Sequence, residues 1–77
     1  MYFETTEYFE ARRRHHGVTV EHVREALENE ERRERQPDGR IRVWGYVRDF
    51  QKYVRVVLLS DGFTVLNAFP DRSYGRG

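Results

Sequence analysis

The sequence predicts an α+β fold in which two N-terminal helices pack on one face of a four-stranded antiparallel meander sheet. Residues 5–30 carry helix-type spacing of apolar residues with capping signals, whereas residues 40–69 alternate between apolar and polar side chains as strands do. Two turn sequences, Pro-Asp-Gly at 37–39 and Ser-Asp-Gly at 60–62, separate segments with strand patterns. A chain of 77 residues has room for one hydrophobic core, so residues 1–77 are predicted to form a single domain.

The two helices are predicted over residues 6–16 and 19–30. Two consecutive threonines can cap the first helix, because a hydroxyl oxygen accepts a hydrogen bond from an unpaired amide of the first turn. Gly17 ends that helix, since glycine readily adopts the positive φ of a C-terminal cap. Thr19 is the predicted N-cap of the second helix. The apolar stripe of the second helix consists of Val20, Val23, Ala26 and Leu27.

The four strands follow the helices along the chain. They are predicted at 32–36, 40–48, 52–59 and 63–69, with a tail at 70–77. The first of them is highly charged, which suits an edge strand, and the turn directly after it favours a hairpin with the second. Pro70 ends the last strand, because proline has no N–H to donate to a ladder.

Alternation in the second strand predicts which face of the sheet the helices cover. Its covered side consists of Ile41, Val43, Gly45 and Val47. Its opposite side consists of Arg42, Trp44, Tyr46 and Arg48. Gly45 marks either a β-bulge or a place where a helix comes close to the sheet.

Composition narrows the class of protein. The chain has no cysteine, which excludes disulfides and thiolate metal sites; its three histidines are not clustered, so no metal site and no cofactor are predicted. No apolar run approaches the roughly 20 residues that span a bilayer, and the acidic N-terminus lacks a signal-peptide layout. We therefore expect a cytoplasmic protein without membrane association.

The charges are distributed unevenly, although the net charge is only +1. Residues 19–31 carry five Glu and one Arg, whereas residues 40–55 carry four Arg and one Lys against one Asp. The second helix is therefore acidic and the sheet is basic. A basic sheet can meet phosphates, and charge balance between helix and sheet accounts for the same pattern.

The chain resembles a known superfamily in the order of its elements and in their residues. The resemblance runs from Arg12 through GVT and VEHVREALEN, and then through PDGRIRVWGYV, KYVRVVLLSDG and NAFPD. These segments resemble the RelE/ParE-like toxin superfamily, and they are most similar to BrnT-like toxins and related small bacterial domains. Two features depart from the family's pattern: Tyr8 stands where many related domains have His, and the basic C-terminal extension is reduced to DRSYGRG.

That resemblance implies a toxin with a cognate antitoxin as protein partner. Toxins of the RelE and BrnT types are ribonucleases, so RNA is the implied substrate, whereas the ParE type blocks DNA gyrase. Metal-independent cleavage requires that a 2′-hydroxyl lose a proton and attack the adjacent phosphate while a cation holds the developing charge.

The predicted site combines the uncovered face of the sheet with the tail. The predicted catalytic residues are Arg55 and Arg72 as cations, and Tyr46 and Tyr74 as acids. The predicted substrate-binding residues are Arg40, Arg42, Trp44 and Asn67. The aromatic rings suit stacking against the bases of single-stranded RNA. No general base is identified among these residues.

Other interpretations of these segments stay open. A non-catalytic domain of the same fold would use the uncovered face to bind a protein partner or to form a homodimer. The run of Arg and His at 12–16 either grips phosphates or complements the C-terminal end of the first helix. The glutamates of the second helix are interpreted as a solvated surface rather than as acid–base groups.

Overall fold

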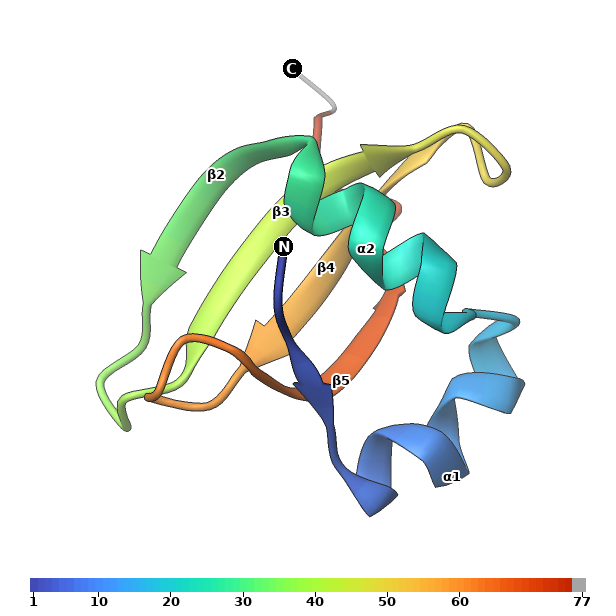
Figure 1. Cartoon of the computed structure of the whole chain (residues 1–77). Coiled ribbons are helices and arrows are strands. Elements are labelled where there is room, and N and C mark those ends of the chain that lie inside the picture. Colours follow the sequence, from blue (N-terminus) through green and yellow to red (C-terminus); the bar gives the residue numbers. More distant parts are fainter. Residues whose placement is uncertain (76–77) are drawn as a thin grey trace.

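Two helices cover one face of a five-stranded sheet in the computed structural model, which describes residues 1–75 (Figure 1). The elements are β1 Glu4–Thr5, α1 Glu7–His16, α2 Val20–Glu28, β2 Glu30–Arg35, β3 Ile41–Val47, β4 Lys52–Leu58 and β5 Thr64–Pro70. The strand order is β1-β5-β4-β3-β2. The predicted α+β class is confirmed. Of the predicted tail, residues 76 and 77 lie outside the described residues.

The prediction of four antiparallel strands is wrong in one respect, because β1 adds a fifth strand and pairs with β5 in parallel. The backbone N–H of Glu4 donates to the carbonyl of Phe63, and that of Thr6 donates to the carbonyl of Val65. A strand of two residues is too short to show alternation, so its pairing depends on where β5 lies. The other four strands form the predicted antiparallel meander.

The boundary between α2 and β2 also differs from the prediction. The helix predicted over 19–30 ends at Glu28 with Asn29 as its C-cap, and the strand predicted over 32–36 begins at Glu30. Pairing with β3 competes with helix extension here, and a register shift between Glu30 and Arg32 leaves Glu31 as the extra residue of a β-bulge. Glu31 is important for the site described below.

The helix caps follow the expected chemistry. The Thr6 hydroxyl accepts from the N–H of Phe9 at 3.0 Å, and Gly17 closes α1 with a φ of 67°. Thr19 caps α2, and the His22 ring returns the bond by accepting from the Thr19 N–H. Within the described residues, neither helix is long and apolar enough to cross a membrane.

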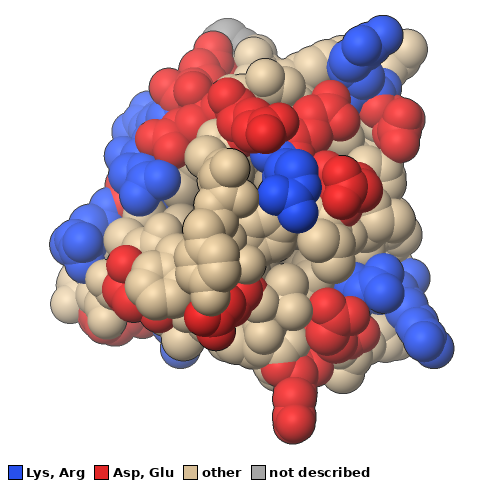
Figure 2. Space-filling view, viewed as in Figure 1, with Lys and Arg blue, Asp and Glu red and all other residues tan. Residues whose placement is uncertain are grey.

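The hydrophobic core lies between the helices and the inner face of the sheet, where α2 crosses β3 and β4 and α1 packs on β5. Its buried residues include Phe9, Val18, Val23, Leu27, Val43, Val54, Val56 and Val65. A Cβ added at Gly45 would lie 1.8 Å from the carbonyl oxygen of Ala26, so α2 can only pack this closely on a glycine. The helix-covered side of the molecule carries acidic side chains over α2 (Figure 2).

Candidate functional site

The face of the sheet away from the helices, which we call the outer face, places three side chains in one row. Trp44 of β3 lies opposite Arg55 of β4, and Arg55 lies opposite Phe69 of β5. The guanidinium carbon of Arg55 is 5.7 Å from the centroid of the Trp44 ring and 5.0 Å from that of the Phe69 ring. Arg55 is therefore flanked by two aromatic rings, an arrangement that favours a cation.

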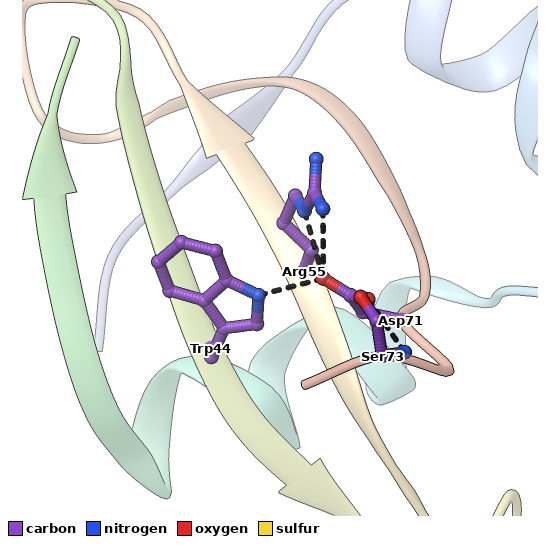
Figure 3. Close-up of polar contacts among 4 residues, drawn as sticks. All are labelled: Trp44, Arg55, Asp71 and Ser73. Carbon is purple, nitrogen blue, oxygen red and sulfur yellow. Dashed lines mark hydrogen bonds and ion pairs between the residues drawn. The ribbon is translucent and has the colours of Figure 1, made fainter. Parts of the chain in front are cut away.

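Asp71, which directly follows β5, ties this row to the tail (Figure 3). One carboxylate oxygen, Oδ2, accepts from the Trp44 indole N–H at 2.9 Å and from Nε and Nη2 of Arg55 at 3.0 and 2.8 Å. The other, Oδ1, accepts from the backbone N–H and the hydroxyl of Ser73. We call these four residues the Asp71 anchor. Because the N–H of Asp71 also donates to the carbonyl of Tyr53, the tail continues along β4.

The Asp71 carboxylate is charged in spite of its burial, with only 7% of the residue exposed. Burial opposes the ionised form, but the hydrogen bonds from Trp44, Arg55 and Ser73 outweigh it and hold the pKa of Asp71 well below its usual range. The anchor is therefore a satisfied ion pair rather than a group poised to exchange a proton near neutral pH.

The tail covers Trp44. The sequence correctly predicts that Trp44 lies on the outer face, but it also predicts an open surface for stacking, which the structure does not show. The residue is only 5% exposed, because the ring of Tyr74 stacks on it at a centroid distance of 5.1 Å and an interplanar angle of 12°. The ring of Tyr53 meets Tyr74 edge-on at 4.9 Å. Trp44 is thus the centre of a small second core that the alternation of β3 alone does not reveal.

Three of the four predicted catalytic residues share one hollow. This tyrosine hollow is lined by Tyr46, Gln51, Lys52, Tyr53, Asp71, Arg72, Tyr74 and Gly75. Tyr46 is 39% exposed and meets the ring of Tyr53 edge-on at 5.4 Å. Arg72 is exposed at the rim. The hollow therefore combines phenol hydroxyls with two cationic side chains.

Arg55, the fourth predicted catalytic residue, lines a different hollow with two predicted binding residues. This basic hollow is lined by Gln36, Pro37, Asp38, Arg40, Arg42, Arg55, Val57 and Phe69. Nε of Arg40 lies 3.5 Å from Oδ2 of Asp38, which makes an ion pair. Arg42, by contrast, forms no ion pair within residues 1–75. The eighth predicted residue, Asn67, lines a separate hollow with Tyr8 and Arg40, and its side-chain oxygen accepts from the N–H of Ala68.

Glu31 is a carboxylate next to the tyrosines that sequence reasoning missed. A hydrogen bond to the Glu31 carboxylate and burial raise the pKa of Tyr53 above its usual value. Burial and the negative charge of Glu31 raise the pKa of Tyr74 in the same way. The bulge in β2 is what brings Glu31 to this side of the sheet. A bulge in a uniformly charged strand leaves no signal in the apolar alternation, which is why position 31 was not identified.

The Arg–His run at 12–16 does not form a single patch. Arg13 pairs with Glu10 at 2.8 Å and donates to the carbonyl of Val18, while the ring of His16 packs 5.6 Å from that of Phe69. Within residues 1–75, no group of three or more His, Asp or Glu side chains is arranged to hold a metal ion. No protein-family model, curated protein or solved structure matches the chain, so function is inferred from the chemistry of the outer face.

Proposed function

We propose that this chain is a domain of the RelE/BrnT toxin type that binds single-stranded RNA across the outer face of its sheet. The observation that carries the proposal is the basic hollow, in which Arg40, Arg42 and Arg55 converge beside the apolar side chains of Val57 and Phe69. Guanidinium groups next to a half-buried ring suit a single-stranded nucleic acid, since phosphates need cations and bases need stacking partners.

The two hollows suggest how a strand would lie. Arg42 and Tyr46 are four residues apart on β3 and point to the same side, so their Cα atoms are separated by about 13 Å. We therefore propose that the RNA runs along β3, with phosphates in the basic hollow and with bases, and the phosphate between them, at the tyrosine hollow. Such a path spans several nucleotides, as in other single-strand binders.

Binding of a labelled ten-nucleotide uridine RNA to the full chain, measured by fluorescence anisotropy against salt, tests this proposal. Replacing both Arg40 and Arg42 by Ala should weaken binding and lower the salt slope by about 0.7 for each lost phosphate contact. Replacing Arg12 and Arg14 by Ala removes the same charge from exposed positions of α1 and serves as the matched control.

Equal losses in the two variants would mean that only net charge matters, which contradicts a specific surface. If the wild type binds no RNA even at low salt, the proposal is wrong, and a non-catalytic domain that binds a protein partner becomes the better interpretation.

Cleavage of the bound RNA is the second candidate, and Glu31 is the observation that favours it. In this scheme the Glu31 carboxylate accepts the proton of a 2′-hydroxyl, whose oxygen attacks the adjacent phosphorus. Lys52, the cation that β4 contributes to the tyrosine hollow, stabilises the negative charge of the phosphorane, and Tyr46 donates a proton to the departing 5′ oxygen. The products are a 2′,3′-cyclic phosphate and a free 5′-hydroxyl.

The cleavage scheme is tested in EDTA by following cyclic-phosphate ends. Glu31→Gln should lower the cleavage rate by about 100-fold or more, while RNA affinity stays close to that of the wild type. Glu30→Gln, the neighbouring exposed residue of β2, is the control for the loss of one carboxylate. Binding without any cleavage by the wild type would leave an RNA-binding domain without ribonuclease activity.

A further inference from the structure

We propose that Trp44 and Arg55 form a nucleotide subsite that the chain's own tail fills when RNA is absent. In this arrangement the Asp71 carboxylate takes the place of a phosphate and the Tyr74 ring takes the place of a base. The inference rests on the proposed RNA binding and adds to it a defined subsite and a competitor for it.

The carboxylate is held as a phosphate would be held. Arg55 directs Nε and Nη2 toward Asp71 Oδ2, and the Trp44 indole N–H donates to the same oxygen at 2.9 Å. Arginine uses the same fork of donors for carboxylates and phosphates. Three donors around one anionic oxygen therefore form a site that a phosphate oxygen fits equally well.

The ring is stacked as a base would be stacked. Tyr74 lies nearly parallel to Trp44, at an interplanar angle of 12°. Every nucleobase has a flat face that stacks on an aromatic side chain in this way, largely without regard to sequence. The tail thus presents an anion and a flat ring to Arg55 and Trp44, which are the two parts of a nucleotide.

Few polar contacts hold the tail against the outer face. Hydrogen bonds join residues 71–75 to the sheet through Asp71, and the ring of Tyr74 adds its contacts with the rings of Trp44 and Tyr53. Ser73 and Gly75 are exposed. None of these residues belongs to the hydrophobic core cluster, so the tail can leave without opening the inner face.

The tail also lies at the boundary between the two hollows. Arg55 lines the basic hollow, whereas Asp71 and Tyr74 line the tyrosine hollow. When the tail moves away, Trp44 and Arg55 are exposed between the hollows. A strand that binds phosphates at Arg42 and stacks at Tyr46 would then pass over this subsite without interruption.

Releasing the tail in the full chain tests the proposal. The double variant Asp71→Asn and Tyr74→Ala should bind the ten-nucleotide uridine RNA about tenfold more tightly than the wild type, because a site that is open only a tenth of the time has its affinity lowered by that fraction. Tyr74→Ala alone, which changes no charge, should also tighten binding.

The matched control replaces Glu28 by Gln and Tyr2 by Ala, which removes one negative charge and one exposed ring from residues that line neither hollow. A gain in the released variant no larger than in this control would overturn the subsite. If the wild type binds RNA in a manner that depends on Arg42 and the released variant shows no gain, only this inference is wrong. Absence of binding in both proteins overturns the proposed function as well.

A measurement on the wild type protects the test against misfolding of the variant. The chain has a single tryptophan, so one indole N–H signal in an NMR spectrum reports the bond to Asp71. Saturating RNA should move this signal and speed hydrogen exchange of the Asp71 amide, which donates to the carbonyl of Tyr53 while the tail covers the outer face. If RNA binds and both signals stay unchanged, the tail does not leave and the proposal is wrong.

Discussion

Different kinds of contact cover the two faces of the sheet. On the inner face, two helices cover a continuous set of apolar side chains. On the outer face, the anchor residue Asp71 and the ring of Tyr74 cover Trp44, and much of the remaining surface is charged or exposed. Apolar burial is non-directional and spread over many residues, whereas the anchor depends on a few directed hydrogen bonds.

The inner face stabilises the fold, whereas the outer face can be rearranged by a ligand. Contacts of the inner face cannot be lost one at a time without opening a cavity or forcing a helix away. The anchor can be broken at one carboxylate, by a proton or by a competing anion, while the core remains intact. The outer face is therefore the part of the molecule that a ligand can rearrange, and the following predictions test that contrast from the largest effect to the smallest.

Val43→Asp should have the largest effect and unfold the chain. Val43 is fully buried on the inner face, and an unpaired buried charge costs about 3–5 kcal/mol. A core of this size supplies about 3–5 kcal/mol in all. Circular dichroism and amide dispersion should show an unfolded protein, whereas Arg42→Asp, one residue away on the outer face, should stay folded. A folded Val43→Asp protein would mean that the faces are assigned the wrong way round.

Gly45→Ala should destabilise the domain by about 1–3 kcal/mol, the usual cost of overpacking. The added methyl group would overlap the Ala26 carbonyl, so α2 must move away from the sheet where it crosses β3. Urea denaturation measures the change as a lower midpoint with an unchanged slope. A midpoint equal to that of the wild type would show that α2 does not lie this close to the sheet.

Asp71→Asn should cost about 1–3 kcal/mol, because the neutral amide no longer balances the Arg55 charge and has one oxygen to accept the bonds that Asp71 divides between two. The emission of Trp44 should shift to the red as the tail loosens. Glu28→Gln, which removes an exposed carboxylate, should change neither property. If Asp71→Asn keeps the wild-type emission and midpoint, the anchor contributes nothing to closing the outer face.

The pH dependence of stability should differ between the wild type and Asp71→Asn. Since the pKa of Asp71 is lower in the folded chain than in the unfolded chain, its stabilisation is complete above the unfolded pKa of about 3.9 and is lost as the pH falls through the folded value. Between pH 5 and 3, unfolding free energy should therefore fall more steeply for the wild type than for Asp71→Asn. Parallel curves would contradict a charged, anchored Asp71.

Ser73→Ala should have the smallest effect, about 0.5 kcal/mol, because it removes one hydroxyl donor from Asp71 Oδ1 and leaves the bonds at Oδ2 in place. The emission of Trp44 should stay as in the wild type. A red shift as large as that of Asp71→Asn would show that the conformation of the tail, rather than the ion pair, holds the outer face closed.

Local and periodic features were predictable from the sequence. Thr19 as a cap and the inward set of β3 follow from short spacings, and the close approach of a helix at Gly45 was one of two expected explanations. Arg42, Trp44, Tyr46 and Arg55 do lie on the outer face, because alternation with a period of two assigns each side chain of a strand to a face. Arg72 and Tyr74 follow β5, and only the path of the tail brings them to this face. The division of the predicted residues between two hollows was not predictable.

The sequence by itself thus determined the covered face, the turns and the helix caps, since each depends on neighbours within a few positions. Only the tertiary structure decided the parallel pairing of β1, the placement of Glu31 beside the tyrosines and the role of Asp71. Asp71 meets a tryptophan 27 positions away and an arginine 16 positions away. Such contacts depend on strand register, on a bulge and on the path of the tail, and none of these leaves a periodic trace in the sequence.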